Sequence, residues 1–240
     1  MAASLLYFKG FQMRVVPGQP TDYPNLNKWF DAMETLPSYQ LTKSDYYTHS
    51  WDLPPQLGGC NYEPGCEPFE KAINGDQSIL NGQRSSWSLP LEPHNGGIEP
   101  DWEWAMQGAN REAVERVSAN HQAIVKFAAR GAGKPGMPPV SAPLADPNAQ
   151  SNPAVHAAVD ACFRVIMMAL LDESTDKYND RMRQITSAMV EEGGPGFVQA
   201  VVDSLAYVRD RIGVPRDMKL PAARLLRAHL NWAIDCLAER

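Results

Sequence analysis

The densest group of chemically active side chains lies in residues 45–52, a segment that we expect to be a loop. It contains two carboxylates, one imidazole and three aromatic rings: Asp45, Tyr46, Tyr47, His49, Trp51 and Asp52. An aspartate beside His49 could orient the imidazole ring and raise its basicity, as general-base catalysis requires. These groups could instead hydrogen-bond to the backbone of the loop. We favour that simpler role, because no nucleophile or acid at a defined spacing completes a mechanism. We therefore predict no catalytic residue and keep the six as ligand or interaction candidates.

The sequence has four cysteines: Cys60, Cys66, Cys162 and Cys236. They are too few and too scattered for a disulfide scaffold. The spacing of Cys60 and Cys66 matches neither a zinc ribbon nor a thioredoxin motif, although His49 and His94 could complete a site with them. We predict no metal site and leave a redox role for Cys60 and Cys66 open. The other two cysteines lie on apolar helix faces and are expected to pack as small hydrophobic residues.

The C-terminal region is locally basic. Six cationic residues, offset only by Asp210 and Asp217, fall within it: Arg209, Arg211, Arg216, Lys219, Arg224 and Arg227. Such a bias could bind an acidic partner or lipid headgroups. We favour a solvated helix surface with charge pairs four residues apart.

Four tryptophans lie in segments with helical spacing: Trp29, Trp102, Trp104 and Trp232. They could line a hydrophobic or pigment-binding pocket. Helical spacing favours core packing instead.

The elements that must position these residues are predicted to be helices only, because no strand-like alternation occurs. In residues 24–34 an apolar stripe predicts one buried face, formed by Leu26, Trp29, Phe30 and Met33. A long helix is expected from Pro100 to Gly131, as the longest element of the chain. Four more are expected over 153–171, 176–192, 197–212 and 221–238, of which the first is apolar nearly all round and should be central to a bundle.

Composition bounds the class of protein. The chain has 240 residues, 44% hydrophobic and 21% charged, with a net charge of −6, which indicates a folded globular protein and disfavours nucleic-acid binding. The longest uninterrupted apolar stretch, 165–171, is far shorter than the roughly 20 residues of a membrane-spanning helix, so no span is expected. The 20 prolines and 17 glycines cluster in 54–100 and 131–153 and predict long irregular connections. We divide the chain into a helical region at 1–59, an irregular connection at 60–100, and a helical bundle at 101–240 with a loop at 133–152.

Three segments carry a family resemblance. Residues 23–39 contain Tyr-Pro-Asn-Leu, then Trp and Phe, a Met-containing turn and a Pro. This pattern resembles the late helix of glutathione S-transferase C-terminal domains. Residues 41–60 resemble a plastid-type transferase-like family of plants and algae, and residues 214–218 with 227–232 look like the C-terminal helix of that family. The resemblance implies transferase-like helices in the N-terminal part of an all-α chain.

The departure from the family shapes the functional expectation. Transferases bind glutathione mainly in an N-terminal thioredoxin-like domain, which also supplies the group that activates the thiol, and no such segment occurs here. We therefore expect a non-catalytic interaction, structural or ligand-binding subunit with no cofactor. The alternative is the C-terminal part of an active glutathione S-transferase whose glutathione-binding domain is absent from this chain.

An apolar N-terminal segment leads to the expectation about partners. It reads as the interior of a helix and contains Leu5, Leu6, Tyr7, Phe8 and Phe11, which suggests that a covering layer or an upstream part is missing. A protein partner or a homodimer is expected to cover it. The resemblance to plastid proteins implies the chloroplast, in the stroma or peripheral to a thylakoid photosynthetic complex; the cytoplasm is the alternative.

Overall fold

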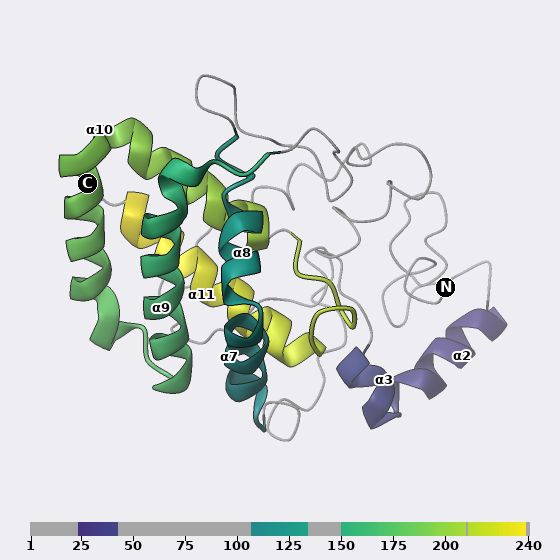
Figure 1. Ribbon diagram of the computed structural model, residues 1–240. Coiled ribbons are helices and arrows are strands. Elements are labelled where there is room, and N and C mark those ends of the chain that lie inside the picture. The colour runs from purple at the N-terminus through teal and green to yellow at the C-terminus, as the bar shows by residue number, and fades with distance from the viewer. Residues whose placement is uncertain (1–23, 43–106, 134–149, 210, 239–240) are drawn as a thin grey trace.

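The computed structural model describes residues 24–42, 107–133, 150–209 and 211–238 (Figure 1). Of the described residues, 80% are helical and none is in a strand, which confirms the predicted all-α fold. A few side chains in the helix at residues 24–34 also lie outside the described part of the chain.

Five α-helices and two short 3₁₀ helices form the bundle in the described part of the C-terminal half. They are α7 (Ala109–Ala119), α8 (His121–Ala128), η4 (Pro153–Val155), α9 (His156–Leu171), η5 (Asp176–Tyr178), α10 (Asn179–Arg209) and α11 (Leu220–Ala238). In Figure 1, α7, α8 and α9 stand in front of α11, and α10 closes the bundle beside α9. The last helix therefore packs against α7, α9 and α10.

Two helices are described before the bundle, α2 (Pro24–Glu34) and α3 (Pro37–Thr42). Pro24 suits the start of α2, where its missing N–H costs nothing. The prediction that Trp29 is buried is wrong, because 43% of its surface is exposed. Among the described helices, the extensive packing of α2 is against α3, which has no buried residue. Of the predicted apolar stripe, the two described side chains are not buried: Trp29 is exposed and Met33 is half-buried.

The long helix expected to end at Gly131 is two helices where the structure describes it. The break lies at Asn120, which has φ −120° and ψ 17°. Its side chain Nδ2 donates to the carbonyl of Arg116 at 3.2 Å, and such side-chain bonds compete with the helical ladder. The longest uninterrupted helix among the described residues is instead α11, with 19 residues.

The glycine-rich break predicted between two later helices is a kink within α10. Gly194 has φ 69° and ψ −169°, and Pro195 follows it. The positive φ suits glycine, and proline cannot continue the preceding hydrogen-bond ladder. The sequence therefore located the interruption correctly, and the chain bends there without a connecting loop.

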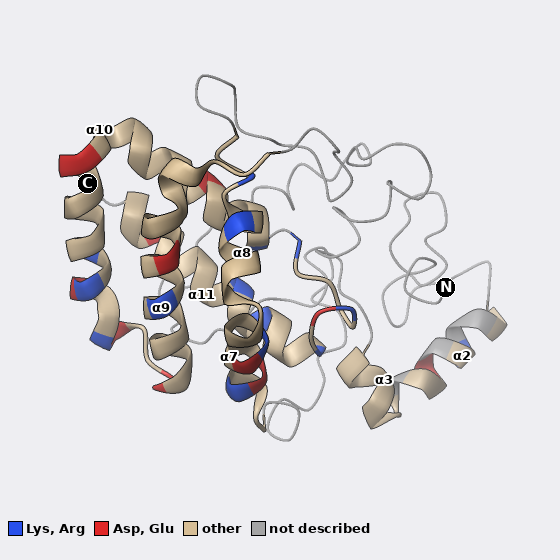
Figure 2. Cartoon of the chain, in the orientation of Figure 1, with Lys and Arg blue, Asp and Glu red and all other residues tan. Residues whose placement is uncertain are grey.

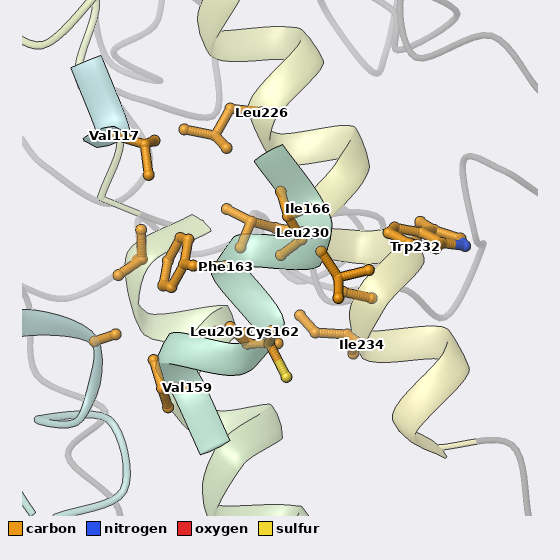
Figure 3. Close-up of a cluster of buried hydrophobic side chains, with 14 of the residues drawn as sticks. Val117, Val159, Cys162, Phe163, Ile166, Leu205, Leu226, Leu230, Trp232 and Ile234 are labelled. Atoms are coloured by element: carbon orange, nitrogen blue, oxygen red, sulfur yellow. The ribbon is translucent and has the colours of Figure 1, made fainter. Parts of the chain in front are cut away.

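The core lies between α9, α10 and α11, as Figure 3 shows with Phe163, Ile166, Leu205 and Leu230. The expectation that residues 153–171 are central holds in part, because one face of α9 is buried while Met168 and Leu171 are 49% and 58% exposed. The most enclosed helix is α11, in which all residues except Asp235 and Ala238 are buried.

One described segment, Pro153–Leu171, is long and apolar enough to cross a membrane by length and composition. Its mean hydropathy is 1.8 over the scored window, and 44% of that window is buried. A core helix passes the same test, and α9 packs against α7, α8, α10 and α11.

Candidate functional site

A cavity of about 570 Å³ lies between α7, α8, α9, the end of α10 and the start of α11. Its wall is largely apolar and includes Val117, Ile124, Phe127, Phe163 and Leu226. Figure 3 shows Val117, Phe163 and Leu226, which reach it from three different helices. Small-molecule sites in proteins have roughly 300–1,000 Å³ and mostly apolar walls. The size and lining of this cavity fit that class.

The connection between α10 and α11, residues 211–219, forms one side of the cavity. Hydrogen bonds between its own residues hold it in shape. Arg216 folds back so that its Nη2 donates to the carbonyl of Arg211 at 2.8 Å. Its Nε and Nη2 also reach the two carboxylate oxygens of Asp217, at 3.1 and 2.9 Å. Asp217 in turn accepts from the backbone N–H of Gly213 at 2.7 Å. This wall is therefore held in place without a ligand.

Buried arginines anchor the same connection, which overturns the expectation of a solvated basic surface. Four of the six basic residues are buried: Arg209, Arg211, Arg224 and Arg227. The Nη1 of Arg209 donates to the side-chain oxygen of Asn231 at 2.7 Å, and the Nη2 of Arg227 donates to the carbonyl of Ile212 at 2.6 Å.

The end of α10 explains why these cations are buried. The last carbonyls of a helix lack intrahelical donors and carry its negative dipole end. The Nη1 of Arg211 donates to the carbonyl of Tyr207 at 3.0 Å, and its guanidinium lies 3.5 Å from the centre of the Tyr207 ring. Because guanidinium groups supply donors and positive charge together, they suit this buried helix end.

The mouth of the cavity carries an unpaired cation. Arg116 is exposed, and its side chain has no hydrogen bond or ion pair among the described residues. The acidic residues near it on α7 are engaged elsewhere. Glu112 accepts from the backbone N–H of Lys219 at 3.0 Å, and Glu115 pairs with Arg111 at 2.8 Å. Figure 2 shows the basic and acidic positions on α7 and on the connection beside it.

A second polar cluster joins α8 to α9. His121 Nε2 contacts the Asp160 carboxylate, which also accepts from Arg164 at 2.7 Å. The hydrogen bond from Arg164 lowers the pKa of Asp160, and His121 adds to the effect. Because Asp160 serves two partners, this cluster acts as a cross-link between helices.

Ser151 and His156 form a third polar pair, with 2.7 Å between the Ser151 Oγ and the His156 Nε2. A serine nucleophile needs a base that is itself oriented by a third group. In the described ranges no carboxylate bonds to His156, and Asp160, one turn further along α9, is occupied by the cross-link. The pair therefore lacks the group that would orient the base.

The two described cysteines, Cys162 and Cys236, are buried and form no disulfide with a described residue, as the sequence predicted. The Sγ of Cys236 donates to the side-chain oxygen of Asn179 at 3.8 Å. Burial raises the pKa of the Cys162 thiol to about 12, so it stays protonated at neutral pH.

The candidate residues from the sequence lie outside the described part of the chain. This holds for Asp45, Tyr46, Tyr47, His49, Trp51 and Asp52, for Cys60 and Cys66, and for Leu5, Leu6, Tyr7, Phe8 and Phe11. Of the tryptophans, Trp232 is in the core, as expected, and is not among the described residues that line the cavity.

Sequence reasoning missed the cavity. It noticed Arg211 and Arg216 as part of a basic region but not Arg116, which lies far away in the chain. One local signal was present: Arg116 directly precedes the buried Val117, at the edge of the apolar face of α7.

Comparisons with protein-family models, curated proteins and solved structures found no match. Among the described residues, no group of three or more histidine, cysteine, aspartate or glutamate side chains could hold a metal ion.

Proposed function

We propose that this chain is a non-catalytic helical protein that binds a small apolar molecule in the cavity between α7, α8, α9 and α11. The observation that carries the proposal is the cavity itself, about 570 Å³ in volume with an apolar wall drawn from several helices. Burial of apolar ligand surface would supply the binding free energy, at roughly 25 cal/mol per Å².

The polar groups around the cavity support binding more than catalysis. Arg216 and Asp217 are bonded to each other, and Arg211 is bonded to the end of α10. These bonds keep the wall in shape, and a preformed wall lowers the cost of ordering on binding.

The resemblance of residues 23–39 to a transferase helix supports a wider proposal. The chain is a transferase-like subunit without glutathione-conjugating activity, held by a protein partner or a second copy in a plastid complex. The ligand site in the bundle is compatible with this role, because it lies in α7–α11 and does not need the N-terminal helices.

The test uses a neutral apolar dye, Nile red, and the full chain. We expect saturable binding with increased fluorescence, because the dye would move from water to a largely apolar wall. Ile124→Trp replaces an aliphatic side chain of the cavity wall by a bulky indole ring that fills part of the cavity, and it should abolish binding. The control is Val190→Trp, an exposed position on α10 that is not among the lining residues, and it should bind as the wild type does.

Two outcomes would oppose the proposal. Absence of saturable binding to the wild type would overturn it, as would equal binding by the Ile124→Trp variant. Retention of the chain on immobilised glutathione would favour the alternative of an active transferase.

A further inference from the structure

The charges around the cavity are unequal in sign. The described residues that line it include three arginines, Arg116, Arg211 and Arg216, and one carboxylate, Asp217. Because Asp217 makes a two-point contact with Arg216, these two charges largely neutralise each other. Arg116 and Arg211 are the other two cations of the wall, and only Arg116 among the three arginines is without a hydrogen bond or ion pair to a described residue.

The two remaining cations occupy different environments. Arg211 is buried, held by the Tyr207 carbonyl and by the Tyr207 ring. Its guanidinium is therefore held at a fixed place in the wall. Arg116 is exposed at the mouth, and its guanidinium has no described partner to give up before it contacts a ligand.

The two acidic side chains of α7, Glu112 and Glu115, contact groups other than Arg116. Glu112 is one helical turn before it on α7, but its two oxygens face the backbone N–H and the ammonium group of Lys219, at 3.0 and 3.9 Å. Glu115 is bonded to Arg111 on the exposed surface. A guanidinium in this position is suited to a carboxylate or a phosphate.

We propose that the ligand of the cavity is a small amphiphilic anion, with a carboxylate or phosphate head held by Arg116 and an apolar body among Val117, Phe127, Phe163 and Leu226. This inference rests on the proposed function and adds the chemical class of the ligand. At about 30 Å³ for each water-sized unit, the cavity holds on the order of twenty non-hydrogen atoms. A single chain or a small ring system of that size fits.

The experiment compares four ligands with the same twelve-carbon chain, all below their critical micelle concentrations. Dodecanoate, dodecyl phosphate, dodecanol and dodecylammonium are titrated against the full chain at pH 7.5, and binding is followed by displacement of Nile red. We expect at least one of the two anions to bind ten times more tightly than dodecanol, and dodecylammonium to bind most weakly. The preferred head distinguishes a fatty acid from a phosphate ester as the source.

Arg116→Gln tests the assigned contact. It should remove most of the preference for the anions and leave the affinity for dodecanol unchanged. Lys126→Gln is the matched control, because it removes one positive charge from the exposed surface of the neighbouring helix α8 at a residue that does not line the cavity. It should retain the preference. Helical content from circular dichroism verifies that both variants fold.

The outcomes separate this inference from the proposed function. Equal binding of the four ligands would overturn the anion assignment and leave the ligand-binding function intact. An unchanged anion preference in Arg116→Gln would overturn the role of Arg116. Failure of all four ligands and of Nile red would overturn the ligand-binding function itself, and the inference with it.

Discussion

The helices α2 and α11 have similar apolar patterns in the sequence but differ in how deeply their tryptophans are buried. Each has a tryptophan in an apolar stripe at helical spacing, yet Trp29 is 43% exposed and Trp232 is 3% exposed. The indole N–H of Trp232 donates to Asn179 at 2.9 Å, so that its polar end is also satisfied. The difference lies in the neighbours, because α11 packs against three long helices and α2 packs mainly against the short α3.

The comparison teaches that periodicity identifies the face of a helix and not the partner that covers it. In α11 even a cationic side chain is enclosed, since Arg227 donates to the carbonyl of Ile212 in the connection that follows α10. In α2 an aromatic side chain remains at the surface, since no large apolar surface of the described helices meets it.

Replacement of each tryptophan by alanine should give the largest difference in stability between the two helices. Trp232→Ala is expected to lower the free energy of unfolding by about 3–5 kcal/mol, because a buried ring and a buried hydrogen bond are lost. Trp29→Ala should cost about 1 kcal/mol or less. Urea unfolding followed by circular dichroism measures both values, and similar losses would mean that the two helices are not different in packing.

Loss of a buried polar contact of α11 should give the next largest decrease in the free energy of unfolding. Asn231→Leu keeps the side-chain size but removes the acceptor of Arg209, and we expect a loss of about 2–3 kcal/mol. The control is Asn110→Leu on α7, where the side-chain amide bonds to Glu173 at the surface at 3.0 Å. That change should cost about 0.5 kcal/mol or less. An Asn231→Leu protein as stable as the wild type would show that the buried arginine does not depend on this acceptor.

Two glycines of the bundle differ in how much space surrounds them, and alanine substitutions should report this difference. A Cβ at Gly131 would lie 2.4 Å from the carbonyl oxygen of Asp203 and 2.6 Å from the Cβ of Tyr207, so Gly131→Ala should cost about 1–3 kcal/mol. A Cβ at Gly196 would meet nothing within 4 Å. Gly196→Ala should therefore stabilise by up to about 1 kcal/mol. Thermal unfolding of the pair provides the measurement, and equal melting temperatures would contradict it.

The burial of α11 also predicts that the stability of the protein depends on pH. Burial lowers the pKa of His229, whose Nδ1 bonds to the carbonyl of Leu225 at 2.8 Å. The unfolded chain therefore binds a proton more readily than the folded one. The stability from the neutral ring is complete above pH 6.5, the ordinary pKa, and is lost as the pH falls from there through the folded pKa.

A variant isolates this contribution. Urea midpoints of the wild type should fall as the pH is lowered below 6.5, and His229→Gln should show a weaker fall over the same range. His156→Gln is the matched control, since its ring is only partly buried and bonds to Ser151. Identical pH profiles for wild type and His229→Gln would exclude His229 as the cause.

Much of the fold was predictable because helix formation depends on nearby residues. The all-α class, the interruption at Gly194 and the helices at 156–171 and 220–238 follow from apolar spacing, glycine and proline. The break at Asn120 was missed, because one asparagine within a strong apolar pattern is a weak signal. The candidate site was not predictable, because its walls come from segments as far apart in the chain as Arg116 and Leu226.

The sequence by itself determined where the described helices of the bundle run and which apolar residues share a face, since both depend on contacts three or four residues apart. Only the tertiary structure decided which faces are covered. It buried Arg209 at the end of α10 and Arg227 in α11, left Trp29 at the surface, and placed Arg116 beside a cavity that no single helix forms. The physical reason is that burial depends on the neighbour supplied by the rest of the chain, and a buried cation is stable only where that neighbour offers acceptors.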